Sequence, residues 1–105
     1  MEEIELKAVE LSKRENCKVQ PIVFVDEETQ EQIIGYIKEP QRMVKLRVMD
    51  KAMTSPVTAS AELFDSIFLA KDSDPRFLTE DKYYLGGTME AFKTVEMAVN
   101  TFKKK

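Results

Sequence analysis

The chain has 105 residues, of which 43% are apolar and 33% are charged. This length suits one domain, and the apolar fraction is too high for a disordered chain, so we expect a single domain over residues 1–105. Nineteen acidic and sixteen basic residues give a net charge of -3, whereas a protein that neutralises several phosphates needs a basic balance. The composition therefore argues against nucleic-acid binding.

Cys17 is the single cysteine, which rules out an internal disulfide. The first residues begin acidic, and no apolar run approaches the roughly 20 residues of a membrane-spanning helix. We therefore expect a cytoplasmic protein with neither a signal peptide nor a membrane partner.

Residues 2–15 are mostly Glu, Leu, Lys and Ala, and they predict an N-terminal helix. The alternation of Ile4, Leu6 and Ala8 with charged residues also fits a strand. Asn16 suits a left-handed helix end, which favours the helix.

Two short β-branched and aromatic runs, at 22–25 and 33–37, predict a β-hairpin within residues 20–38. The polar stretch 26–32 between them is expected to form a solvated loop. Because two strands alone are only marginally stable in water, we expect one face of the hairpin to pack against helices.

Residues 40–103 are predicted to be helical. Pro40 suits the first turn of a helix that runs to about residue 53. The apolar positions of that helix are Met43, Val44, Leu46, Val48, Met49 and Met53.

Ser55 and Pro56 predict the start of the next helix, which we expect to be the central core helix and to end between residues 71 and 75. Its apolar positions form two adjacent stripes: Val57, Ala61, Phe64 and Phe68 in one, and Leu63, Ile67 and Ala70 in the other.

Thr79 is predicted to cap a short helix that Gly86 and Gly87 close, and Thr88 to cap the last helix. The last helix is expected to dock through Phe92, Val95, Val99 and Phe102. The predicted fold class is therefore α+β, with a two-stranded antiparallel hairpin packed against four to five α-helices, mainly C-terminal to it.

The sequence contains no histidine, which removes the commonest general base and every Ser-His or Cys-His pairing. Cys17 is expected to be an inert thiol, because only Lys18 nearby offers to stabilise a thiolate. Carboxylate pairs are numerous, and without geometry none is assigned a role. We predict that the protein is not an enzyme and uses no cofactor.

Asp72, Ser73 and Asp74 resemble the opening of a calcium loop, but Phe77 stands where the loop needs Gly and Tyr83 where it needs Glu. We therefore expect no metal site, and we expect the aspartates to cap or solvate the turn before Pro75. Likewise, the Gly86-Gly87 pair lacks the sequence context of a phosphate-binding loop.

Four residues are candidates for contact with a protein partner: Tyr36, Met43, Tyr83 and Tyr84. Methionines suit adaptable apolar surfaces, although filling a core is their commoner use. Tyr83 and Tyr84 are adjacent on a helix and cannot both face inward, so we expect one of them to be an exposed anchor.

A series of short segments spread over the chain carries a family resemblance. They are Lys18-Val19, Ile22-Val23-Phe24, the step made by Gly35, Tyr36, Lys38, Pro40 and Arg42, then Asp50-Lys51-Ala52, Pro56, Ala59 and Glu62-Leu63-Phe64. The step matches the pattern Gly-Tyr-x-Lys-x-Pro-x-Arg. From about residue 13 to 100, the chain resembles the small tail assembly chaperone-like proteins of tailed bacteriophages and prophages.

The resemblance implies a non-enzymatic protein that binds the long, helical, apolar tape measure protein before the tail tube polymerises around it. Two alternatives stay open. One is a structural virion component, such as a tail-completion or head-tail connector subunit, which small size and an exposed hairpin edge favour. The other is a generic small protein-binding adaptor, and a homo-oligomer is compatible with all three.

Overall fold

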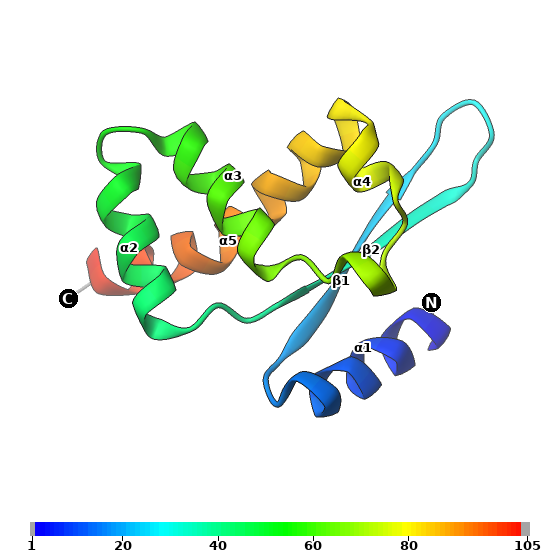
Figure 1. Ribbon diagram of the computed structural model, residues 1–105, viewed down its shortest axis with the longest axis horizontal. Coiled ribbons are helices and arrows are strands. Elements are labelled where there is room, and N and C mark those ends of the chain that lie inside the picture. The colour runs from blue at the N-terminus through cyan, green and yellow to red at the C-terminus, as the bar shows by residue number, and fades with distance from the viewer. Residues whose placement is uncertain (1, 104–105) are drawn as a thin grey trace.

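A β-hairpin separates one N-terminal helix from a group of C-terminal helices (Figure 1). The computed structural model describes the backbone of residues 2–103 and the side chains of residues 3–95. The elements, in chain order, are α1 (Glu2–Glu15), β1 (Val19–Val25), β2 (Gln32–Lys38), α2 (Arg42–Ala52), α3 (Pro56–Ile67), the 3-10 turn η1 (Ala70–Asp72), α4 (Arg76–Thr79) and α5 (Asp81–Lys103). This arrangement confirms the predicted α+β fold. No helix in the described part of the chain is long and apolar enough to span a membrane.

The hairpin pairs β1 with β2 in an antiparallel register that runs from Val19 opposite Lys38 to Val25 opposite Gln32. Its loop is closed by Asp26, whose carboxylate accepts the backbone N–H groups of Glu28 and Thr29 at 2.9 and 3.2 Å. The second edge of β2 is covered by the segment after α3: Phe68 bridges Ile37, and the Leu69 N–H donates to the Tyr36 carbonyl at 2.9 Å. In the described part of the chain, β1 pairs with no strand besides β2.

Both faces of the hairpin are buried, not one as the sequence suggested, because strand side chains alternate between faces. Ile22, Ile33 and Ile37 face the C-terminal helices and belong to the main core. Val19 and Tyr36 face the other way and form a second, smaller core with α1. The fold is thus a three-layer stack of α1, hairpin and helices.

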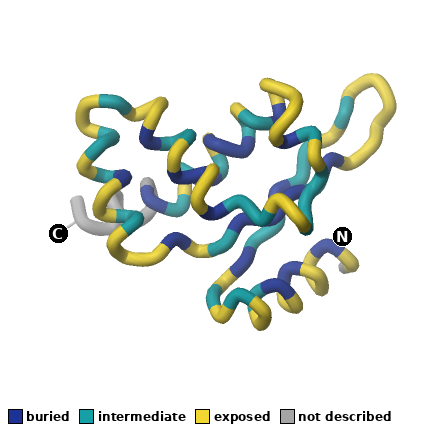
Figure 2. The backbone as a smooth tube through the Cα atoms, viewed as in Figure 1, coloured by how far each residue is buried: buried dark blue, intermediate teal, exposed yellow. Residues whose placement is uncertain are grey.

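The α1 segment is a helix, and its buried side chains Ile4, Ala8 and Leu11 recur at spacings of four and three. Asn16 ends it with φ 56°, as predicted for a left-handed terminator. Figure 2 shows the resulting pattern, in which buried positions line the hairpin side of α1 and exposed positions line the outside.

The α3 helix is the core helix that the sequence predicted. It buries Ala59, Leu63, Phe64 and Ile67. It begins at Pro56, but its expected cap Ser55 makes no side-chain capping hydrogen bond. Two expectations were wrong: Val57 is 78% exposed, and the helix ends at Ile67, because Phe68 turns into the bridge with β2.

The predicted break at Gly86 and Gly87 was wrong, because α5 runs through both glycines as one helix. Neither glycine has a positive φ, so neither supports a turn. A Cβ on Gly86 would lie 2.7 Å from Cζ of Phe24, and one on Gly87 would lie 2.6 Å from Cε1 of Phe64. The glycines let the helix pass closely over two aromatic rings.

Two predicted caps also fall elsewhere. Thr79 is the last residue of α4, and Thr88 is buried inside α5, where its hydroxyl donates to the Leu85 carbonyl at 2.7 Å. Val95 is buried as predicted and Phe92 packs at the edge of the core, whereas the side chains of Val99 and Phe102 lie outside the described residues.

Candidate partner-binding surface

Gly35, the first residue of the predicted family step, lies where β2 crosses the aromatic core. A Cβ at this position would lie 2.7 Å from Cε2 of Phe77 and 3.1 Å from Cε1 of Phe68. Phe77 is fully buried, so it cannot move aside. The glycine is therefore required for packing.

Tyr36 lies on the opposite face of β2, under α1, and is only 3% exposed. Its ring is covered by Lys7, whose Nζ lies 5.4 Å from the ring centroid, and its backbone N–H donates to Ser73 Oγ at 2.9 Å. Burial, assisted by the charge of Asp72, raises the pKa of the Tyr36 hydroxyl. The structure places this predicted partner contact in the smaller core.

The rest of the step runs from β2 into α2. Lys38 Nζ lies 3.8 Å from Glu15 Oε1, so the lysine reaches back to the end of α1. Pro40 is buried in the extended link, and α2 begins only at the exposed Arg42, so the prediction of Pro40 in the first helical turn was wrong. Gln41 takes the N-terminal flanking position instead.

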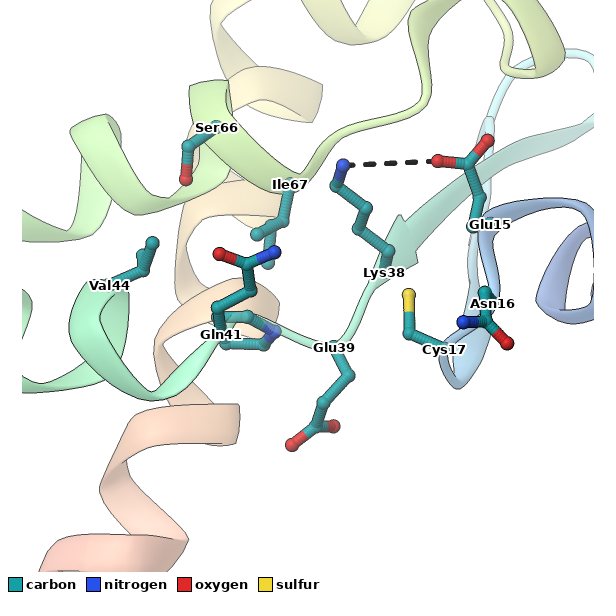
Figure 3. A pocket seen from close by; sticks show the side chains of 10 residues that line it. Glu15, Asn16, Cys17, Lys38, Glu39, Gln41, Val44, Ser66 and Ile67 are labelled. Atoms are coloured by element: carbon teal, nitrogen blue, oxygen red, sulfur yellow. Dashed lines mark ion pairs between the residues drawn. The ribbon is translucent and has the colours of Figure 1, made fainter.

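A pocket of about 470 Å³ opens where the ends of α1, β2 and α3 meet the start of α2 (Figure 3). Its lining comprises Glu15, Asn16, Cys17, Lys38, Glu39, Pro40, Gln41, Val44, Ser66 and Ile67. The charges of the pocket are paired, Lys38 with Glu15 and Glu39 with Lys45, whose Nζ is 2.7 Å from Glu39 Oε1. The pocket thus offers shape and a half-buried thiol, but no unbalanced charge.

The Tyr83-Tyr84 pair divides into one buried and one half-buried ring, so neither is the exposed tyrosine that the sequence predicted. Tyr83 is 4% exposed and packs 6.3 Å from both Phe24 and Phe77, measured between ring centroids. Tyr84 is half-buried, and its ring makes an edge-to-face contact with Phe64 at 5.5 Å between centroids. Its hydroxyl donates a hydrogen bond to Asp65 Oδ1 at 3.0 Å. Burial and then this hydrogen bond raise the pKa of Tyr84.

Met43 is the one predicted contact residue that is open to solvent, at 66% exposure. It does not stand alone, since Leu46 is exposed three residues later on the same helix and Met53, the residue that follows the helix, is exposed seven residues after Leu46. Exposed charges at Arg47 and Asp50 complete this side of α2. We call Met43, Leu46, Arg47, Asp50 and Met53 the α2 face.

Exposed apolar side chains also occur in pairs on two other helices. Leu6 and Val9 lie on the outer side of α1, and Leu85 and Met89 lie one turn apart on α5. Leu6 was predicted only as part of an alternating pattern, and no role was predicted for Val9. The sequence indicates a shared outer side for Leu6 and Val9 through their spacing of three residues. This pair falls between the buried positions Ile4, Ala8 and Leu11.

The Asp72-Ser73-Asp74 segment binds arginines and backbone, in agreement with its prediction as a turn. Asp72 accepts two bonds from Arg14 at 2.7 and 3.2 Å, and Asp74 Oδ1 accepts the Arg76 backbone N–H at 2.9 Å. These arginines hold the pKa of Asp72 and of Asp74 below the usual 3.8. Among residues 3–95, no group of three or more His, Cys, Asp or Glu side chains is placed to hold a metal ion.

Comparison of the chain with protein-family models, with curated protein sequences and with solved structures finds no match.

Proposed function

We propose that this protein is a non-enzymatic chaperone of tailed-bacteriophage or prophage tail assembly, which binds the tape measure protein in the cytoplasm of the bacterial host. The observation that carries the proposal is the α2 face, where three large apolar side chains lie open to water. Two of the three are methionines, whose flexible thioethers adapt to varied apolar partners. The face directly follows the Gly35-to-Arg42 step on which the resemblance to such chaperones rests.

The α2 face suits a helical client. Met43 and Leu46 lie on one side of a helix of 11 residues, and Met53, the residue that follows the helix, extends this stripe. A second helix lays its own apolar stripe into such a surface through positions three and four residues apart. A tape measure protein is long, helical and apolar, and therefore presents such stripes before it is enclosed in a tail tube.

Co-expression with the tape measure protein of the same gene cluster tests the proposal. We expect the long protein to stay in the supernatant and to co-purify with the wild-type chain. The double variant Met43→Ser/Leu46→Ser should lose that complex, whereas the matched control Leu85→Ser/Met89→Ser on α5 should keep it. Equal recovery of the tape measure protein without this chain would contradict the proposal.

A structural virion component is the second candidate, and the free edge of β1 favours it. An edge strand is able to accept a strand from a neighbouring subunit. Pro21 lies on this strand and lacks a backbone donor, which restricts such pairing. Mass spectrometry of purified particles separates the two candidates, since a connector is present in stoichiometric amount and a chaperone is absent.

A further inference from the structure

The outer side of α1 carries four exposed residues at spacings of three, one and three. They are Leu6, Val9, Glu10 and Lys13, which we call the α1 face. Residues at these spacings share one side of a helix. The opposite side of α1 is held on the hairpin through Ile4, Ala8 and Leu11, so the α1 face points away from the rest of its own chain.

The α2 face repeats the spacing of the α1 face with the charges inverted. Aligned in sequence, Leu6 corresponds to Met43, Val9 to Leu46, Glu10 to Arg47 and Lys13 to Asp50. In both faces two apolar residues are followed by a charge and, three residues later, by the opposite charge. All eight residues are exposed.

The four charged residues of the two faces are not used in ion pairs with other residues of the described part of the chain. Within residues 3–95, Glu10, Lys13, Arg47 and Asp50 form no ion pair. Other charges of the same two helices are used internally. Lys45 and Lys51 of α2 bind Glu39 and Glu62, and Arg14 of α1 binds Asp72.

We propose that the α1 face of one copy of this chain docks on the α2 face of a second copy. In a parallel, in-register alignment the apolar residues of the two helices meet each other. Glu10 then lies at the level of Arg47, and Lys13 at the level of Asp50. The occupant is inferred from this complementarity, because both halves of the contact are present on the same chain.

The contact is heterologous, since it joins two different surfaces. In a pair, one copy keeps an unused α2 face and the other keeps an unused α1 face, so association continues into an open chain or closes into a ring. A contact between two short helix faces is at the small end of specific interfaces, and we expect it to form at micromolar concentration. It also covers the proposed client face, so a second copy and a client exclude one another there.

Sedimentation velocity of the purified protein at rising concentration tests the inference without any client. The weight-average mass should rise with concentration at low salt and fall back at high salt, because exposed charges are screened. Glu10→Lys alone and Arg47→Glu alone should each stay monomeric, since each places like charges opposite one another. The control Glu27→Lys makes the same charge change on the hairpin loop and should associate like wild type.

Mixing separates this contact from every other mode of association. An equimolar mixture of the Glu10→Lys and Arg47→Glu variants should associate, because all contacts between unlike variants are again attractive. The double variant Glu10→Lys/Arg47→Glu should associate by itself for the same reason. A wild-type chain that stays monomeric at every concentration overturns the inference. So does a mixture that stays monomeric. A Glu10→Lys variant that still associates while Arg47→Glu does not would also overturn the inference, because it indicates a symmetric α2 pair.

Discussion

Arg14 of α1 and Asp72 of η1 are joined by two parallel hydrogen bonds, Nη2 to Oδ2 at 2.7 Å and Nη1 to Oδ1 at 3.2 Å. Lys7 adds a bond from its Nζ to the Asp72 backbone carbonyl at 3.3 Å. A paired arginine and carboxylate fix orientation as well as distance. This link fastens α1 to the segment that covers the edge of β2.

Removal of the Arg14 partner should loosen α1 without unfolding the helical layer. In Asp72→Asn the charge is lost while the side-chain shape is kept, so the amides of residues 4–15 should exchange with deuterium faster than in wild type. The amides of α3 should be unchanged, because the main core does not include Asp72. Hydrogen exchange read by mass spectrometry measures both regions in one experiment. Equal protection of α1 in variant and wild type would show that the small apolar core alone holds this helix.

Stability should fall in acid. The pKa values of Asp72, Asp74 and Glu31 lie below their ordinary values of 3.8, 3.8 and 4.5, because arginines donate hydrogen bonds to the ionised forms. The unfolded chain therefore binds more protons than the folded chain, and the stabilisation is lost as pH falls below about 4.5. Urea unfolding between pH 7 and pH 2.5 measures the slope. Asp72→Asn should flatten that slope, and an identical slope in the variant would show that Asp72 contributes nothing to it.

The two glycines of α5 should respond differently to alanine. Alanine at Gly87 meets the ring of Phe64, which is fully buried, so we expect a loss of about 1–2 kcal/mol after the gain in helix propensity. Alanine at Gly86 meets Cζ of Phe24, the far end of a half-buried ring that is able to shift, so we expect a smaller effect. Urea unfolding of the two variants gives the comparison. A more stable Gly87→Ala protein would contradict the close packing seen here.

A charge change on α1 should separate self-association from client binding. Glu10→Lys alters the α1 face and leaves Met43, Leu46 and Met53 untouched, so it should abolish association between copies while the tape measure protein still co-purifies. Size-exclusion chromatography with light scattering reports the first property and affinity co-purification the second. Loss of both in this variant would place the client on α1 instead of α2.

Local patterns predicted the parts of the fold that depend on neighbours in sequence. The helix end at Asn16, the hairpin runs and the core helix begun by Pro56 were all predicted from residue type and spacing. Gly86 and Gly87 were misjudged because a glycine pair favours a turn when only its neighbours are known. Their purpose depends on Phe24 and Phe64, which approach α5 only in the folded chain.

The same limit applies to the candidate surface. Met43 was predicted as a contact residue, and it is exposed. Tyr36 was selected for its size, and the covering of the second hairpin face by α1, which buries it, is a long-range arrangement without a local signal. The correspondence between Glu10 and Arg47 was present in the sequence, but it gains meaning only once both residues are known to face outward.

Because both faces of the hairpin are buried, α1 shields one apolar face of the sheet from water. Proteolytic cleavage near Asn16 would remove a helix that covers Val19, Val23, Ile34 and Tyr36, and would turn one whole side of a two-stranded sheet into an apolar surface in water. Flat apolar β surfaces next to a free strand edge are prone to intermolecular pairing. An N-terminally clipped chain should therefore keep much of its helical content and yet precipitate, so that a small N-terminal loss governs how long the protein survives in solution.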